Sequence, residues 1–324
     1  MKNRVGLGTF PLAGVFSVVP TDEAKKIVRM FIEEGGHYID AAPMYAYGYV
    51  EELLGQTLKD YKRSEYCLMT KCGYVGVEDK KLIKSSKPKD VVEECERSLK
   101  RLKMDYIDIY LVHAPDLETP FADTVATLED LQKEGKIKEF GVCNVSLGEL
   151  KLYNQNGSIK YVQNRFSLIN RGVDSEFAKY LTDSKIKLMP YQSIERGQLT
   201  SKIFENYKIS ESDLRSSKPE WEYERYAVIA EWVKNSLFPI ARKAHVPLSQ
   251  LAIAWCLAQP YVGWVQVGTT NQEHLVMNLD ADKININNDL IREVDKSYRE
   301  LETLVKERFG KEVYEFRGLN EKHY

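Results

Sequence analysis

The stretch Tyr38-Ile39-Asp40-Ala41-Ala42-Pro43-Met44-Tyr45 decides how the rest of the chain is interpreted. It begins with apolar residues, as a buried strand does, and Pro43 ends it. Asp40 stands at the end of this strand and Tyr45 follows in the next turn. An aspartate in such a position is usually a turn former or a helix cap, so the pair alone is weak evidence for catalysis. It gains weight only if other strands end in similar chemistry.

Eight apolar runs of this kind alternate with helical stretches along the chain. They cover residues 5–10, 38–42, 66–71, 106–113, 137–144, 161–166, 186–191 and 262–269. Strands that are apolar on both faces and separated by helices predict a parallel sheet, and eight such units predict an α/β protein with a (β/α)₈ TIM barrel. The alternative, an open doubly wound sheet, would need a G-x-G-x-x-G loop after a strand, and the chain has none.

Capping residues and prolines between the runs predict where helices begin, and a long polar segment predicts a loop. The expected helix starts are Thr21 with Asp22 as caps, and Pro88, Pro120 and Pro247. A polar loop over residues 195–226 follows the seventh strand, and a helix near 288–308 leads into a polar tail. We expect one domain over residues 1–324, because the length suits a single large α/β barrel.

Loops as long as these usually carry function in a compact fold. We therefore expect the segment 215–226 and the tail to wall a pocket whose aromatic and arginine side chains suit a polar, anionic or sugar-like substrate. The alternative is that these side chains only pack the loops. The residues of the tail that carry this expectation are Phe309, Tyr314, Phe316 and Arg317.

Composition restricts the partners and the compartment. The chain has 324 residues, is 43% hydrophobic and carries a net charge of −2, so nucleic acid is a poor partner. Its five cysteines form no C-x-x-C pair, which indicates neither a disulfide framework nor a zinc site and suits a reducing cytoplasm. The apolar run 5–19 resembles a secretion signal, but it contains glycines and a proline and no cleavage site follows. No run reaches the ~18 residues of a membrane span, so no membrane partner is expected.

The ends of the eight predicted strands are rich in polar side chains. In a barrel these positions face one shared mouth. They are Thr9, Asp40, Lys71, His113, Asn144, Gln163, Tyr191 and Gly268. Each of these residues alone has an ordinary structural explanation, such as a salt bridge or a turn. Their occurrence together at the strand ends indicates a functional site.

This set of residues predicts a proton transfer to a carbonyl oxygen. The pKa of a free phenol is ~10, and a nearby cation lowers it. Lys71 is the expected cation for Tyr45, Asp40 its counterion, and His113 the group that orients the carbonyl. No side chain stores a hydride, so a nicotinamide cofactor is expected to supply it. Asn144 and Gln163 could pair with its carboxamide and Tyr191 could stack on its ring, whereas the five histidines have no metal-ligand spacing.

At these residues the chain resembles the aldo-keto reductase family, over about residues 5–278. D-A-A-x-x-Y at 40–45 resembles the family's D-T-A-x-x-Y-G, and T-K at 70–71 resembles its T-K strand end. The most specific match is S-L-K-R-L-x-x-D-Y-I-D-I-Y-L-V-H at 98–113. G-K-I-x-x-x-G-V-C-N at 135–144 resembles G-K-I-R-x-x-G-V-S-N, and G-Q-L-T-x-K at 197–202 resembles the G-x-L-T-G-K loop of the longer, bacterial-type members.

The resemblance implies a reductase that converts an aldehyde or ketone to an alcohol, with a sugar or another polar carbonyl compound as candidates. It implies NADP as the cofactor, with NAD as the second possibility, and a catalytic tetrad of Asp40, Tyr45, Lys71 and His113. The implied cofactor contacts are Gly8, Thr9, Asp40, Asn144, Gln163, Tyr191, Gln192, Ser193, Gly197, Leu199, Lys202, Gly268, Thr269, Thr270, His274 and Asn278. The alternative is a non-catalytic subunit that senses nicotinamide nucleotides, as the family's potassium-channel β-subunits largely do.

The chain departs from the family pattern at the site itself. Cys143 replaces a serine that binds the cofactor, and Ala114 replaces the usual tryptophan after His113. In the turn 268–271 no cation stands where many relatives carry arginine or lysine for the 2′-phosphate of NADP, and a threonine cannot replace that charge. We therefore expect weak discrimination between NADP and NAD, unless Lys202 or another cation reaches the phosphate.

Overall fold

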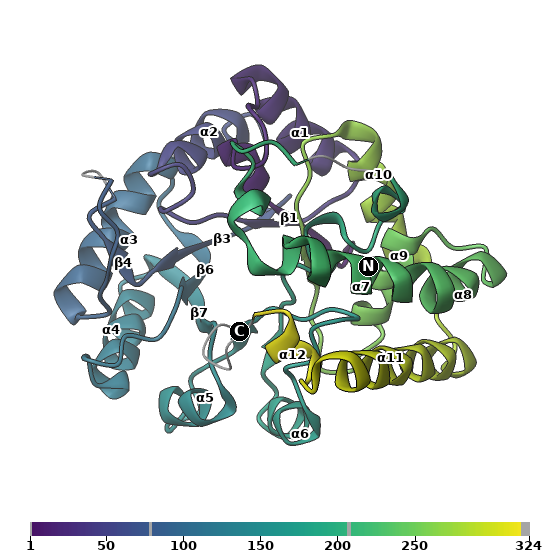
Figure 1. Ribbon diagram of the computed structural model, residues 1–324. Coiled ribbons are helices and arrows are strands. Elements are labelled where there is room, and N and C mark those ends of the chain that lie inside the picture. The colour runs from purple at the N-terminus through teal and green to yellow at the C-terminus, as the bar shows by residue number, and fades with distance from the viewer. Residues whose placement is uncertain (1, 78–79, 206–208, 319–324) are drawn as a thin grey trace.

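The computed structural model describes residues 2–77, 80–205 and 209–318. Its central sheet contains eight parallel strands in the order β10-β1-β2-β3-β6-β7-β8-β9. A parallel bridge between Leu188 and Val262 joins the two ends of this order, so the sheet closes into the expected barrel, seen in Figure 1. The strands are β1 Val5–Gly8, β2 Tyr38–Asp40, β3 Cys67–Cys72, β6 Ile107–Val112, β7 Ile137–Cys143, β8 Tyr161–Gln163, β9 Lys187–Leu188 and β10 Val265–Val267. The small hairpin of β4 Tyr74–Val75 and β5 Ile83–Lys84 lies outside the barrel sheet.

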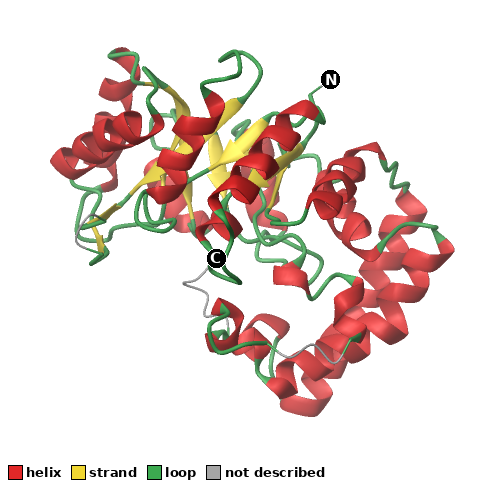
Figure 2. Ribbon diagram, turned by 90° about the horizontal axis from the view of Figure 1, so that it is seen from above, coloured by secondary structure: helices red, strands yellow, loops and turns green. Residues whose placement is uncertain are grey.

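Helices surround this barrel, and a further helical group extends to one side of it (Figures 1 and 2). The surrounding helices are α1 Thr21–Glu33, α2 Tyr49–Leu58, α3 Pro88–Leu102, α4 Phe121–Lys133, α5 Leu147–Tyr153, α6 Ser175–Asp183, α9 Leu248–Leu257 and α10 Gln272–Asp280. The further group consists of α7 Tyr223–Trp232, α8 Phe238–Lys243 and α11 Asn288–Phe309, and the short α12 Val313–Phe316 turns back from α11 toward the barrel. No helix of the described ranges is long and apolar enough to cross a membrane.

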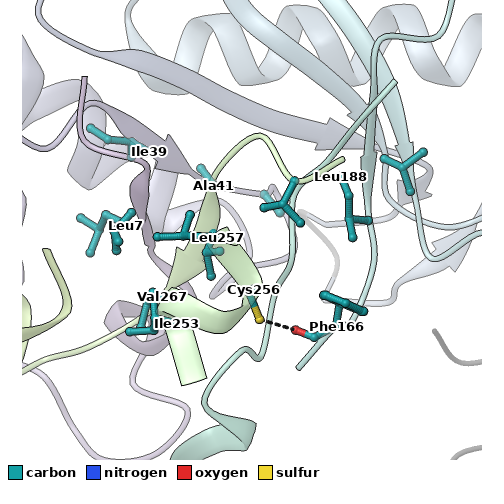
Figure 3. Close-up of a cluster of buried hydrophobic side chains, with 14 of the residues drawn as sticks. Leu7, Ile39, Ala41, Phe166, Leu188, Ile253, Cys256, Leu257 and Val267 are labelled. Carbon is teal, nitrogen blue, oxygen red and sulfur yellow. Dashed lines mark hydrogen bonds between the residues drawn. The ribbon is translucent and has the colours of Figure 1, made fainter. Parts of the chain in front are cut away.

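Two apolar layers hold the barrel together because side chains alternate along each strand. The inward cluster contains Met69, Ile109, Leu111, Cys143, Met189 and Trp264. Outward residues such as Leu7, Ile39 and Val267 belong to a larger buried cluster that also includes residues of α9, where Cys256 Sγ donates to the carbonyl oxygen of Phe166 over 3.7 Å (Figure 3). The same alternation places the next inward positions at the carboxyl ends of the strands, where Asp40, Lys71, His113 and Gln163 stand.

Most of the expected boundaries are confirmed, and one helix cap is wrong. Pro88 is the first residue of α3, and Pro120 and Pro247 are the N-cap residues of α4 and α9. At α1, however, the N-cap is Pro20, and no side-chain hydrogen bond caps this end, so Thr21 and Asp22 belong to the first turn. The extended backbone of Pro20 already leads into the helix, which starts earlier than the capping pair suggested.

The expected long loop between β9 and α7 is present and consists of short 3₁₀ turns. They are η2 Glu195–Gly197, η3 Ser201–Phe204, η4 Leu214–Ser217 and η5 Pro219–Trp221. The backbone N–H of Leu214 donates to the carbonyl of Val15 over 2.8 Å, which joins this loop to the segment after β1. The last part of the expected tail, residues 319–324, lies outside the described residues.

We predict that Gly141→Ala destabilises the barrel. A methyl group at Gly141 in β7 would meet the backbone carbonyl of Tyr161 in β8, which cannot move without breaking the strand pairing. Such overpacking costs about 1–3 kcal/mol of the free energy of unfolding, measured by urea denaturation. Gly148→Ala is the control, because Gly148 in α5 has only Ser146 Oγ at 3.9 Å, and it is expected to be neutral or stabilising by roughly 0.5–1 kcal/mol. Equal effects of the two substitutions would contradict the packing argument.

Candidate active site

The phenol of Tyr45 is held by a tight turn between β2 and α2. The backbone N–H of Gly48 donates to the carbonyl of Pro43 over 2.7 Å and closes the turn. Ala46, Tyr47 and Gly48 have φ values of 49°, 53° and 88°, a run of left-handed residues for which only the glycine is well suited. The turn folds the chain back over the end of β2, so that Tyr45 is buried although it lies in a loop.

Lys71 connects the members of the site. Its Nζ donates to Asp40 Oδ1 over 2.8 Å, to the carbonyl of Ala41 over 2.7 Å and to Tyr45 Oη over 3.2 Å. The Tyr45 hydroxyl donates to Asp40 Oδ2 over 3.4 Å. Lys71 is 0% exposed and Asp40 is 5% exposed, so this ion pair is enclosed by protein. The expected grouping of Asp40, Tyr45 and Lys71 is therefore present in the structure.

Burial, and not Lys71, has the larger effect on the phenol. Burial raises the pKa of Tyr45 well above its ordinary value, and Lys71 acts in the opposite direction without outweighing it. The expected effect of Lys71, which lowers the pKa of Tyr45, is present, but burial raises this pKa by more, so that in the protein alone it stays above that of a free phenol. Burial also disfavours the charge of Lys71, but Asp40 reverses this and raises the pKa of Lys71 above its usual range. At neutral pH the site holds a protonated phenol beside an ammonium group.

His113 follows β6 and completes the group. Its ring meets the ring of Tyr45 edge to face at a centroid distance of 6.2 Å, and the ring of Tyr74 at 5.5 Å. Burial, and after it the charge of Lys71, lower the pKa of His113 well below its ordinary value. The imidazole is therefore neutral at physiological pH, and one ring nitrogen can donate a hydrogen bond.

Three residues were expected to contact the carboxamide and the ring of the cofactor: Asn144, Gln163 and Tyr191. They lie close together, but the amide of Gln163 faces the ion pair of Asp40 and Lys71. Tyr191 Oη donates to Asn144 Oδ1 over 2.6 Å, and Asn144 Nδ2 donates to the carbonyl of His113 over 2.7 Å. Gln163 Nε2 donates to Asp40 Oδ1 over 2.8 Å, so this amide nitrogen supports the ion pair. Cys143 Sγ lies 3.8 Å from Gln163 Oε1, which places the replacement for the family's serine beside Gln163.

The residues expected at the phosphate end lie around β1, β10 and the start of α10. Thr9 Oγ1 donates to the carbonyl of Asp40 over 2.6 Å, and Gly268 packs so closely on Pro11 that a methyl group there would lie 2.6 Å from Pro11 Cγ. Asn271 caps α10 by accepting from the N–H of His274. Thr269 and Asn278 are buried nearby, and Thr270 is exposed.

Lys202 is the cation that the long loop brings to this end. Burial, and next the charge of Lys202, lower the pKa of His274 below its ordinary value. His274 is therefore neutral at physiological pH and supplies no charge for a phosphate. Lys202 lies close enough to His274 for its charge to act on that side chain. Upstream in the same loop Gly197 has a φ of 103°, and Leu199 is fully buried.

The sequence patterns did not predict one residue of the site, and they predicted different surroundings for others. Phe10 packs on Tyr45 with a centroid distance of 5.1 Å, and no spacing pattern marks it because it comes from the loop after another strand. Arg215 is paired with Asp213 through two oxygens and does not present an uncompensated charge to an anionic substrate. Phe316 and Arg317 are 3% and 1% exposed, so they pack inside the protein, which agrees with the alternative of loop packing and not with walls of an open pocket.

Comparisons with known proteins find similar proteins over most of the chain. A sequence profile of the Aldo/keto reductase family matches residues 4–299. The chain is 34% identical over 262 residues to the aldo-keto reductase YhdN of Bacillus subtilis, covering 80% of this chain and 78% of the relative. It is 31% identical over 299 residues to the NADH-specific methylglyoxal reductase of Escherichia coli, covering 88% and 91%. The solved structure of the glycerol dehydrogenase AKR11B4 from Gluconobacter oxydans matches it with a TM-score of 0.81 at 25% identity, covering 95% and 93%.

The fold and the site together define a barrel enzyme with its polar site at the carboxyl ends of the strands. The profile match and the two relatives show that the chain belongs to the aldo/keto reductase family. This confirms the resemblance carried by the motifs, and with it the expected class, an oxidoreductase.

We predict that Asp40→Asn destabilises the protein by about 3–5 kcal/mol, because it leaves the ammonium group of Lys71 buried without a carboxylate. The double variant Asp40→Asn/Lys71→Met removes both charges and is expected to recover most of that loss. Urea denaturation of the two variants and the parent protein measures the difference. If the double variant were as unstable as the single one, the loss would not arise from an uncompensated charge.

Proposed function

We propose that the protein reduces a small polar aldehyde or ketone to an alcohol, with a nicotinamide nucleotide as the hydride donor. The observation that supports this best is the position of Lys71 Nζ, which lies 2.8 Å from Asp40 Oδ1 and 3.2 Å from Tyr45 Oη. A buried cation beside a protonated phenol stabilises negative charge that develops on that phenol as it loses its proton. The names of two relatives, a methylglyoxal reductase and a glycerol dehydrogenase, support a small oxygenated substrate.

In this proposal Tyr45 is the general acid. Its hydroxyl gives its proton to the carbonyl oxygen of the substrate, and the resulting phenolate is stabilised by Lys71 at hydrogen-bond distance. Asp40 keeps Lys71 charged and aimed, through the contact at 2.8 Å. Neutral His113 donates a hydrogen bond to the same carbonyl oxygen and sets its direction. In the oxidation of an alcohol the same groups act in reverse, with the phenolate of Tyr45 as the base.

The residues of the mouth fit a nicotinamide nucleotide, which supplies the hydride when it is bound. Gln192 Oε1 and Ser193 Oγ are buried and have no hydrogen-bond partner among the described residues, and such atoms normally have one. They directly follow Tyr191, whose ring lies beside the amide of Asn144. We propose that these four residues bind the nicotinamide half, and that the segment 197–202 and the start of α10 bind the phosphates and the adenosine half.

The alternative, a non-catalytic subunit that senses the nucleotide, differs in one observable. A panel of aldehydes, ketones and sugars is offered with NADPH or NADH, and absorbance at the nicotinamide band is followed. Turnover with any of them supports the reductase proposal. Tight binding of the nucleotide with no turnover on the whole panel would favour the sensing subunit.

We predict that Tyr45→Phe lowers kcat for reduction by at least ~10²-fold, the usual scale for loss of a general acid. The fold and the binding of NADPH should be retained, because the ring and its packing on Phe10 remain. Tyr47→Phe is the matched control, since Tyr47 is 46% exposed in the same turn, and it should leave kcat unchanged. Steady-state kinetics and fluorescence titration measure the two effects. Normal turnover of the Tyr45→Phe variant would show that the proton comes from elsewhere.

We predict weak discrimination between NADPH and NADH, with Lys202 as the source of the remaining preference. A charge-assisted contact to phosphate is worth about 1.5–3 kcal/mol, or roughly ten- to a hundred-fold in affinity. Lys202→Met should therefore raise the Kd of NADPH by about that factor and leave the Kd of NADH unchanged. Lys234→Met, in the outer helical group, is the control. A preference for NADPH that survives Lys202→Met would place the phosphate on another cation.

A further inference from the structure

A buried ionic cluster joins the C-terminal segment to the loop after β9. Its members, here called the Arg317 cluster, are Arg165, Glu195, Arg196, Gln198, Glu220 and Arg317. Arg165 follows β8, the next four residues lie in the loop between β9 and α7, and Arg317 follows α12. In Figure 1 the short α12, in yellow, lies between α11 and the strands at the centre of the view. The catalytic proposal uses none of these side chains.

Among the described residues, the side chain of Arg317 donates two hydrogen bonds, and both acceptors lie in the same short segment of the loop. Its Nη2 donates to Glu195 Oε2 over 2.9 Å and its Nη1 donates to Gln198 Oε1 over 2.8 Å. Gln198 Nε2 in turn donates to the carbonyl of Glu220 over 2.7 Å. Arg317 and Glu195 are each 1% exposed and Gln198 is 0% exposed. A planar guanidinium that bridges two acceptors fixes their spacing, which a single charge on a flexible chain cannot do.

The segment that Arg317 holds has an unfavourable backbone. Glu195 and Arg196 have φ values of 49° and 51°, in the left-handed region that side chains other than glycine rarely adopt. Such conformations persist only where the surroundings enforce them. Here Glu195 Oε1 accepts from Ser167 Oγ over 2.5 Å, and Arg165 forms an ion pair with Glu195 Oε2. The cluster therefore enforces the path of the chain through residues 195–198.

The segment 195–198 lies between residues of the proposed cofactor site. Gln192 and Ser193, with their unpartnered buried oxygens, lie immediately before it, and Leu199 and Lys202 lie immediately after it. Arg165 is also joined to Tyr191 by a parallel bridge between the two chain segments. A shift of Glu195 or Gln198 would therefore displace both halves of that site, while the ion pair of Lys71 and Asp40 lies on other strands.

The charges of the Arg317 cluster also favour a role in binding the nucleotide. Its three guanidinium groups face two carboxylates, and the Nε atoms of Arg165 and Arg317 have no hydrogen-bond partner among the described residues. Burial lowers the pKa of Arg317 to about 10, although Glu195 acts in the opposite direction. An excess of buried positive charge close to the loop favours an anionic ligand there.

We propose that Arg317 is a positioning residue for the nicotinamide nucleotide: by bridging Glu195 and Gln198 it holds the loop after β9 in the shape that binds the dinucleotide. This inference rests on the proposed function, because it assigns a role toward the same cofactor. It makes the C-terminal segment part of the binding site's support, although that segment touches neither the substrate nor the reacting atoms in this account.

The test compares variants of the full-length protein by fluorescence titration with NADPH and with NADH. Arg317→Lys keeps the charge but cannot bridge both acceptors, and it should raise the Kd of both nucleotides by about ten-fold, the equivalent of one lost charge-assisted contact. At saturating nucleotide kcat should stay within about two-fold of the parent, since the tetrad is untouched. Arg308→Gln is the control, because Arg308 lies in the preceding helix α11 in an exposed pair with Glu231, and it should leave every Kd unchanged.

Two further measurements keep the inference open to refutation. If Arg317→Lys does not fold, Gln198→Leu removes the contact of Gln198 with Arg317, together with its contact with the carbonyl of Glu220, and should raise both Kd values in the same direction. Hydrogen exchange of the amides 195–199 should be faster in either variant before nucleotide is added. Folded variants with unchanged Kd values, or with a lower kcat at unchanged Kd, would overturn the inference. If the parent protein bound neither nucleotide, the proposed function would fail together with it.

Discussion

The buried ion pair between Lys71 and Asp40 is the interaction on which the candidate site depends. Its two members stand on neighbouring strands, and both lie almost completely out of solvent. Two charges in such a place are costly unless each has further partners. The chain supplies three such partners: the carbonyl of Ala41 and the hydroxyl of Tyr45 from the turn after β2, and the amide of Gln163 from β8. The same set of contacts leaves the phenol beside a fixed cation, which is the arrangement that a proton donor needs.

The ion pair stands on two strands of the barrel, whereas most of the proposed cofactor contacts lie on loops. The proposed tetrad lies on β2, the turn after it, β3 and the residue after β6, above the apolar interior formed by residues such as Met69 and Leu111. The proposed cofactor contacts lie on loops, several of whose residues have left-handed backbone conformations, among them Asn144 and Gln192. Strained residues of this kind collect at binding sites because the surrounding contacts enforce them. Glu195 is another residue of this kind, and it is contacted by Arg317, more than a hundred residues further along the chain.

The period of two along the strands explains how much of the site could be predicted from the sequence. Once the barrel was recognised, the last inward residue of each strand had to face the mouth, which placed Asp40, Lys71 and His113 together. Alternation does not give the extent of burial, and therefore the sequence predicted the lowering effect of Lys71 on the pKa of Tyr45 but not the larger raising effect of burial. It also says nothing about contacts between distant loops. The pairing of Arg317 with Glu195 has no local pattern, so these residues could be located only in the folded chain.

The central claim, that a protonated Tyr45 beside a charged Lys71 supplies the proton, is tested most directly by pH–rate profiles in both directions. At saturating cofactor and substrate, kcat for reduction should be constant between about pH 6 and pH 9, because burial keeps the phenol protonated and the imidazole of His113 neutral across that range. Over the same range, oxidation of the product alcohol should accelerate as pH rises, since it needs the phenolate. A reduction rate that instead follows a single group titrating near ~6.5, the ordinary value for histidine, would contradict the account and make His113 the acid.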